Sequence, residues 1–192
     1  MTLHPTLLSC LPAIDPAMGD ILAVIETPKG SPNKYDYDET CGAFRLAGVL
    51  PDGSLFPYDF GFIPSTLGED GDPLDVLVFL DAPMPVGCVL TVRLIGAIEA
   101  KQRKKGEDWI RNDRLLAVAT HAHTHAHVED LDDQRPHLLD EIEAFFGNYH
   151  ALKGSEFKPI GRTGPQRARK LLDGGAEAFR RKRGNGGQTK VA

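Results

Sequence analysis

Three aspartates, Asp70, Asp72 and Asp75, lie within six residues, directly before the apolar run at 76–80. If the chain is extended around Asp70 and Asp72, both side chains point to one face, and the glycine and proline between the aspartates bend the chain and bring Asp75 to the same place. Carboxylates this close repel one another, so shared divalent cations would stabilise them, and oxygen ligands suit Mg²⁺ or Mn²⁺. The alternative is an acidic surface turn that precedes a buried strand.

The composition fits an ordinary globular protein and excludes several functional classes. The 192 residues are 41% hydrophobic and 26% charged, which predicts a single domain spanning 1–192 with its core at about 20–183. A net charge of −5 and a pI near 5.8 give no global case for nucleic-acid binding. Cys10, Cys41 and Cys88 are few and widely spaced, which favours reduced thiols and a cytoplasmic protein. The sequence shows neither a membrane-spanning run nor a secretory signal.

The elements that must position these aspartates are mostly short strands. Runs rich in β-branched residues and bounded by turn signals predict strands at 21–28, 34–39, 42–50, 76–80, 88–100 and 114–128. Their regular spacing favours a closed barrel.

Two helices are expected after the strands. Apolar residues at three- and four-residue steps predict an amphipathic helix from Pro136 to His150 that plugs or flanks the barrel. A second helix is expected from about 165 to 183, interrupted by Gly174 and Gly175, followed by a mobile tail at 184–192.

The segment 55–96 resembles the central stretch of the soluble family I inorganic pyrophosphatases. Their signature D-x-D-P-x-D is met by the three aspartates and Pro73, and the resemblance continues upstream at 24–44 and downstream at 145–150. It implies an α+β, mainly β fold, an OB-like closed five-stranded barrel flanked by two helices. It also implies Mg²⁺-dependent hydrolysis of inorganic pyrophosphate to two phosphates by a metal-activated water, in a homo-oligomer that is a hexamer in bacterial relatives.

The resemblance also assigns roles to individual residues. Asp70 and Asp75 would be metal ligands, and Asp72 would orient or deprotonate the attacking water. The full set of implied metal ligands is Asp70, Asp72, Asp75, Glu26 and, if a loop is shifted, Asp113. The implied substrate-binding residues are Lys34, Asp36, Arg114, Tyr149 and His150. Lys34 and Tyr149 join Asp72 as the implied catalytic residues.

Several positions depart from the family pattern by losing a charge or a hydroxyl group: Gly48, Phe56, Phe60, Gln102, Asn112 and His150. Arg45 is the nearest substitute for the arginine expected at Gly48, but an offset of three residues would place it on the opposite strand face. The loop 101–113 carries basic residues that could replace the lost charge. These departures leave two alternatives open: a hydrolase of another phosphoanhydride, or a catalytically impaired protein that binds phosphate or metal on the same fold.

A histidine-rich run at 121–127 has no counterpart in that pattern. If this run is a strand, His121, His123, His125 and His127 share one face, and adjacent pairs could chelate a transition metal. The metal could be adventitious or physiological. A proton-sensitive subunit contact is the third possibility.

Overall fold

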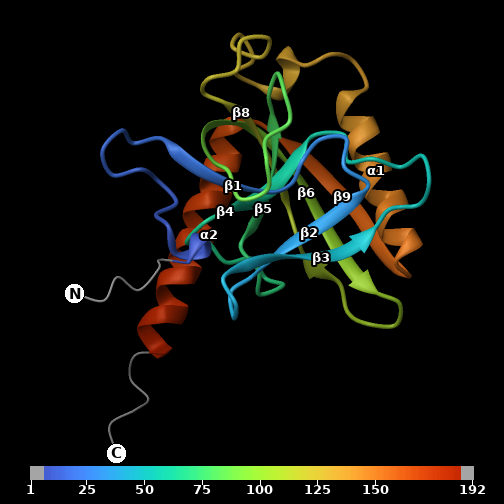
Figure 1. Ribbon diagram of the computed structural model, residues 1–192, viewed down its shortest axis with the longest axis horizontal. Helices are drawn as coiled ribbons and strands as arrows, with labels where there is room; N and C mark the ends of the chain where they lie inside the picture. Colours follow the sequence, from blue (N-terminus) through green and yellow to red (C-terminus); the bar gives the residue numbers. More distant parts are fainter. Residues whose placement is uncertain (1–6, 187–192) are drawn as a thin grey trace, which may run out of the picture.

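The computed structural model describes residues 7–186. Five of its strands close a ring through the pairing of the first with the last, and Figure 1 shows their arrangement. In order around the ring these are β1 (Ile21–Thr27), β4 (Asp59–Ile63), β5 (Leu74–Phe79), β8 (Arg114–Ala119) and β6 (Val89–Lys104). β1 pairs with β6 to complete the circle, with Ile21 opposite Val92. All neighbours are antiparallel except β5 and β8, which run parallel. The predicted mainly β, OB-like five-stranded arrangement is confirmed.

The ring strands are buried because their sequences are nearly continuous apolar runs. Every residue of β4 and β8 is buried, and the last four residues of β5 are buried as well. β-Branched side chains favour this pleated, enclosed environment. The ring is therefore a rigid frame, and polar side chains at the strand ends project from fixed positions.

Four further strands lie outside the ring. β2 (Asn33–Asp38) and β3 (Ala43–Val49) form a separate hairpin, whereas β7 (Ile110–Arg111) and β9 (Ser155–Thr163) pair with β6. The prediction missed β4, β7 and β9. The β9 sequence contains a proline and a glycine and alternates only weakly, so its strand conformation depends on the long β6 beside it.

Helix α1 (Leu138–Leu152) lies beside β9 and buries Ile142 and Phe146, as the periodicity predicted (Figure 1). Helix α2 (Pro165–Gly186) contacts β6 and is continuous through both of its central glycines, so the predicted interruption is wrong. A Cβ atom at Gly175 would lie 2.6 Å from Leu74 Cδ1, which explains the glycine by close packing rather than by a break. No helix within residues 7–186 is long and apolar enough to cross a membrane.

The carboxyl end of the chain also differs from the prediction. α2 continues through 184–186, which were predicted to belong to a mobile tail. The remainder of that predicted tail, 187–192, lies outside the described residues.

The histidine-rich run is not a strand. β8 ends at Ala119, and 121–127 forms turns and bends. The Asp81 carboxylate accepts hydrogen bonds from the backbone N–H groups of His123, at 2.7 Å, and Thr124, at 2.9 Å. This distant carboxylate fixes the turn, so the histidines do not share a strand face and the predicted chelating edge is wrong.

Candidate active site

A tight turn before β5 brings the three aspartates together. The Gly68 N–H donates to Asp72 O at 2.7 Å, and Gly71 has φ +94°, a conformation that glycine adopts without strain. Asp75 follows as the second residue of β5. All three aspartates line one cavity, but Asp70 and Asp72 lie in a turn and not on one face of a strand, so the predicted strand arrangement is wrong.

These aspartates line a cavity of about 840 Å³ between the ring, the β2–β3 hairpin and both helices. We call Glu26, Asp70, Asp72 and Asp75 the acidic wall, and Tyr149, His150 and Lys153 the α1 wall. The other charged or amide side chains that line the cavity are Lys34, Asp36, Glu39, Gln102, Asn112, Arg114, Lys182 and Arg183.

Two amides hold Asp70 in place. Its Oδ2 atom accepts hydrogen bonds from Asn112 Nδ2 at 2.6 Å and from Gln102 Nε2 at 3.4 Å. Burial, together with the nearby Asp75 charge, raises the pKa of Asp70 to about 6. The two amides therefore position this carboxylate without supplying a charge to neutralise it.

Asp75 is paired with Arg114 across the parallel strands. The two residues are register partners of β5 and β8, and Arg114 Nη1 lies 2.6 Å from Asp75 Oδ2. Arg114 is only 3% exposed, and its guanidinium lies 5.0 Å from the Phe146 ring centroid. Burial raises the pKa of Asp75 even though the arginine charge opposes this effect.

Lys34 joins the hairpin to the acidic wall. Its ammonium lies 3.2 Å from Glu26 Oε2, and it also donates to Asp36. Burial raises the pKa of Glu26, whose Oε1 accepts the Tyr37 N–H at 2.8 Å. The Lys34 ammonium lies 4.8 Å from the centroid of Phe60, one of the positions that lack a hydroxyl group of the family pattern.

On the α1 wall, His150 is a nearly buried and neutral side chain. Its ring stacks on Phe157 with centroids 5.4 Å apart, and Nδ1 lies 3.0 Å from Ser155 Oγ. Burial, with Arg114 and Lys153 nearby, lowers the pKa of His150 to about 4. The side chain therefore carries no positive charge at neutral pH, which agrees with the expected loss of charge at this position.

Asp113 does not lie with the other predicted ligands. It is 8% exposed, and its Oδ1 accepts the Ala100 N–H at 2.9 Å and a hydrogen bond from Arg111. Asn112 faces the cavity in its place. The reason is the register at the start of β8, since neighbouring residues point in opposite directions.

Neither predicted source of replacement charge reaches the cavity. A bulge in the hairpin places Arg45 opposite Asp36, so the predicted position on the opposite strand face is wrong. The Arg45 side chain is nevertheless 72% exposed and pairs with Asp38 at 3.0 Å. In the loop 101–113, Arg103 pairs with Glu156 at 3.0 Å, and Arg111 pairs with Glu99 and Asp113. These cations neutralise carboxylates outside the cavity.

The donor chemistry of the acidic wall fits a hard divalent cation. Within residues 7–186, no three His, Cys, Asp or Glu side chains converge closely enough to form a ready-made metal site. Asp70 is instead bonded to amides and Asp75 to Arg114. The wall nevertheless offers only carboxylate oxygens, and burial together with the charge of Asp75 raises the pKa of Asp70, an effect that a bound cation would offset.

Sequence reasoning missed one residue of the α1 wall. Lys153 was not a candidate, although it follows Tyr149 by four residues, the spacing that places two side chains on one helix face. That spacing was the available signal. Gln102 and Asn112 were recognised as departures, but their role as donors to Asp70 requires the three-dimensional structure.

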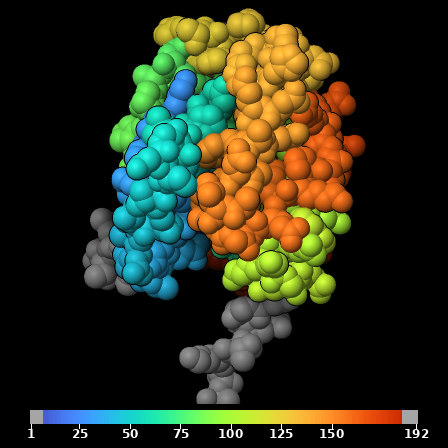
Figure 2. All heavy atoms as spheres, turned by 90° about the vertical axis from the view of Figure 1, so that its right-hand side faces the viewer, coloured from blue at the N-terminus to red at the C-terminus, as the bar shows by residue number. Residues whose placement is uncertain are grey.

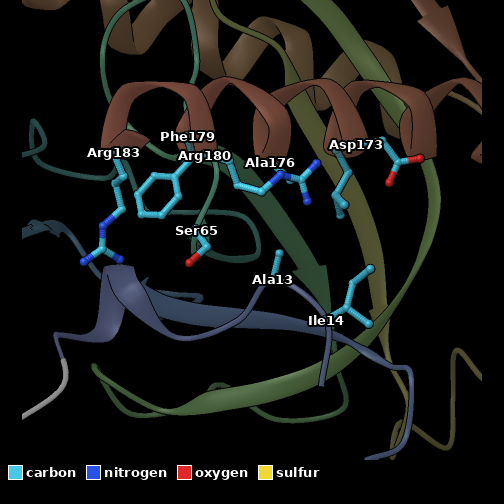
Figure 3. A pocket seen from close by; sticks show the side chains of 9 residues that line it. Ala13, Ile14, Ser65, Asp173, Ala176, Phe179, Arg180 and Arg183 are labelled. Carbon is cyan, nitrogen blue, oxygen red and sulfur yellow. The ribbon is translucent and has the colours of Figure 1, made fainter. Parts of the chain in front are cut away.

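A second hollow, along α2, has a different character (Figure 3). This groove of about 530 Å³ separates α2 from the segment that carries Ala13 and Ile14, and Ser65, Phe179 and Arg180 also line it. Its one carboxylate, Asp173, forms a surface pair with Arg169 at 3.0 Å. The groove lacks a cluster of acidic side chains, so the larger cavity is the candidate active site.

Comparison with known proteins gives a consistent result. Residues 23–180 match the family model described as inorganic pyrophosphatase. The inorganic pyrophosphatase of Nostoc sp. is 40% identical over 173 residues, covering 90% of this chain and 99% of its own. The crystal structure of inorganic pyrophosphatase from Thermus thermophilus superposes with a TM-score of 0.82 at 36% identity, covering 91% of this chain and 99% of that one. The Helicobacter pylori enzyme gives 0.77 at 30% identity, covering 94% and 99%.

Proposed function

This chain belongs to the inorganic pyrophosphatase family, and we propose that it hydrolyses pyrophosphate to two phosphates with Mg²⁺ held by its acidic wall. Members of the family are metal-dependent hydrolases. The observation that carries the proposal is the meeting of Asp70, Asp72 and Asp75 with Glu26 and Lys34 in one cavity.

Asp70, Asp75 and Glu26 are the residues proposed to hold the metal. Mg²⁺ bound there supplies positive charge to the substrate and lowers the pKa of a water molecule. Mn²⁺ has similar preferences for oxygen ligands. Asp113 is left out of the proposed set because its carboxylate is bonded elsewhere.

Asp72 is the proposed proton acceptor. Its carboxylate accepts no hydrogen bond from residues 7–186, so it can turn toward a water molecule. The water oxygen forms a bond to one phosphorus as the bond from that phosphorus to the bridging oxygen breaks. The proton passes to Asp72, and the bridging oxygen leaves with the second phosphate.

Cationic and phenolic donors around the cavity are proposed to bind the phosphate oxygens. Lys34 and Arg114 bring charge from the hairpin and from β8, and Tyr149 contributes a hydroxyl group from α1. Donors arranged before the reaction stabilise the charge that develops on the leaving phosphate. Asp36 supports this arrangement by bonding to Lys34, whereas His150 contributes shape rather than charge.

Phosphate release from pyrophosphate and from nucleoside di- and triphosphates in Mg²⁺ tests the proposal. We expect pyrophosphate to be turned over, and Asp72→Asn to lower kcat by about 10²- to 10⁴-fold, the usual contribution of a positioned acid or base. Asp173→Asn is the matched control, since it removes a carboxylate from the groove in Figure 3.

Two results would contradict the proposal. Turnover that survives Asp72→Asn would disprove the role of that residue. A chain that binds phosphates but hydrolyses no phosphoanhydride would support the non-catalytic alternative.

Three broader predictions remain part of this proposal. A homo-oligomer is expected from the family resemblance, and sedimentation velocity would measure its size.

A single domain spanning 1–192 is expected from length and composition, and a single cooperative unfolding transition would support it. A cytoplasmic location is expected from the three unpaired cysteines, and cell fractionation would test it.

A further inference from the structure

Lys153 is a cation at the mouth of the cavity whose ammonium is held by a phenol. It follows the last residue of α1, and its backbone N–H donates to His150 O at 3.0 Å. Its Nζ donates to Tyr149 Oη and lies 4.4 Å from the centroid of the same ring. The tyrosine lies one helical turn earlier, so this contact directs the lysine toward the cavity that both side chains line.

The lysine stem crosses the space beside Gly48. Gly48 is the register partner of Lys34 in the hairpin, and a Cβ atom built on it would meet only Lys153 Cε, at 4.0 Å. Gly48 and Lys153 line a pocket of about 400 Å³ where the hairpin side of the molecule lies next to α1 (Figure 2), and Lys153 also lines the main cavity. A Cβ atom at this distance makes only ordinary contact, so it is a longer side chain at position 48 that would compete with Lys153 for the space.

Lys153 also differs from the two central cations in its charge balance. Lys34 is paired with Glu26 and Asp36, and Arg114 is paired with Asp75. Within residues 7–186, no carboxylate lies within ion-pair distance of Lys153. Its positive charge is therefore available to an anion.

The other cations that line the cavity and have no ion-pair partner in the described part of the chain belong to α2. Lys182 affects Asp72 electrostatically, and so lies on the side of the acidic wall. On the opposite side, His150 is neutral. Lys153 is therefore the cation that the α1 wall offers to a ligand.

We propose that Lys153 binds a phosphate oxygen of pyrophosphate across Gly48, supplying the positive charge that neither Gly48 nor His150 provides. This inference rests on the proposed function. Because a hydrogen bond that involves a charged group is stronger than a neutral one, the loss of Lys153 should weaken substrate binding. The competing explanation is that the lysine only stabilises the end of α1 through the helix dipole.

Binding of imidodiphosphate, whose P–N–P bridge resists hydrolysis, separates these explanations. Calorimetric titration of the full chain in Mg²⁺ should show Kd raised about 10-fold or more by Lys153→Met, with Lys153→Arg within about threefold of the original chain. Lys158→Met is the matched control, because this exposed lysine lies on β9 outside the cavity. The KM for pyrophosphate should follow Kd, and the unfolding midpoint should change little.

Gly48→Arg provides a second, independent variant. In the Lys153→Met background it should recover at least about threefold in Kd, because the arginine can enter the vacated space. In the original chain it should give a smaller gain, since both cations then compete for one place. This dependence on background is not expected of a residue that only ends a helix.

The outcomes distinguish this inference from the proposed function. A chain that binds imidodiphosphate but does not hydrolyse pyrophosphate contradicts the function alone. Equal Kd values for Lys153→Met and Lys158→Met contradict the role of Lys153 alone. An original chain that fails to bind imidodiphosphate also overturns the inference. So does weaker binding in both Lys153→Met and Lys153→Arg, if it accompanies a lowered unfolding midpoint.

Discussion

The acidic wall and the α1 wall face one cavity but are built differently. The acidic wall is anchored to β1, to β5 and to the turn that precedes β5, and its carboxylates match the family signature. The α1 wall stands on a helix outside the ring, and its cation is Lys153, since His150 is neutral. In the roles proposed above, the metal ligands stand on the rigid frame, whereas the phosphate donors can come from any element that reaches the same anion.

The largest expected effect concerns the acidic wall. Chelation of divalent cations should abolish turnover, and added Mg²⁺ should restore it. Asp70→Asn should raise the Mg²⁺ concentration for half-maximal activity by at least about 10-fold, since even the indirect supports of metal sites contribute factors of this size. A Mg²⁺ titration of activity measures both effects, with Asp173→Asn as control. An unchanged Mg²⁺ requirement in Asp70→Asn would remove this residue from the ligand set.

The ion pair of Asp75 with Arg114, which joins the acidic wall to the ring, should stabilise the fold. Arg114→Met leaves Asp75 without its partner, so in the absence of metal the free energy of unfolding should fall by about 3 kcal/mol, at the lower end for broken buried pairs because Asp75 is partly exposed. Urea unfolding measures the loss. Mg²⁺ should restore part of it by offsetting the Asp75 charge. A variant as stable as the original would show that the pair does not stabilise the frame.

The free energy of unfolding should depend on pH through His150 of the α1 wall. The folded pKa of His150 is lowered to about 4, below the ordinary value of 6.5, so the unfolded chain binds more protons between these values. Its contribution is present above pH 6.5 and is lost as the pH falls toward 4, by about 2–3 kcal/mol. His150→Phe should lack this part of the slope in urea unfolding at several pH values, whereas the exposed His137→Gln should retain it. Equal slopes in both variants would contradict it.

The smallest effect should come from a charge that the structure excludes from both walls. Arg45→Met removes an exposed arginine whose one ion-pair partner within residues 7–186 is Asp38, so neither the KM for pyrophosphate nor the unfolding midpoint should change measurably. Steady-state kinetics and thermal unfolding check this. A raised KM would mean that Arg45 turns into the cavity. The positive charge missing at Gly48 would then come from Arg45 as well as from the α1 wall.

The sequence could predict the acidic wall because its signature is local. Asp70, Asp72 and Asp75 lie close together in any conformation of a short turn, and the regular apolar runs indicated a closed ring. The histidine run misled because its alternation is that of a strand, whereas Asp81, about 40 residues earlier, holds the backbone of His123 in a turn. A contact at that distance leaves no local pattern.

The prediction from sequence was also limited by register, which decides which of two neighbouring residues faces the cavity. Whether Asn112 or Asp113 faces the cavity depends on the start of β8. The spacing from Tyr149 could have pointed to Lys153, but its position beside Gly48 depends on how the end of α1 packs. Both outcomes depend on how elements from distant parts of the chain fit together. The family pattern showed that a positive charge is missing at Gly48, but it could not show that Lys153 lies beside that position.

The parallel pairing of β5 with β8 has a consequence for folding. Asp75 and Arg114 are direct register partners, although 39 residues (114 − 75) separate them along the chain. Pairings between such distant segments form slowly, because the chain must lose the entropy of the intervening loop first. The hydrogen bonds within a helix join residues that are close in the chain, so they form without this loop closure. During refolding, recovery of activity should therefore follow closure of the ring, and helical signal should return before catalysis does.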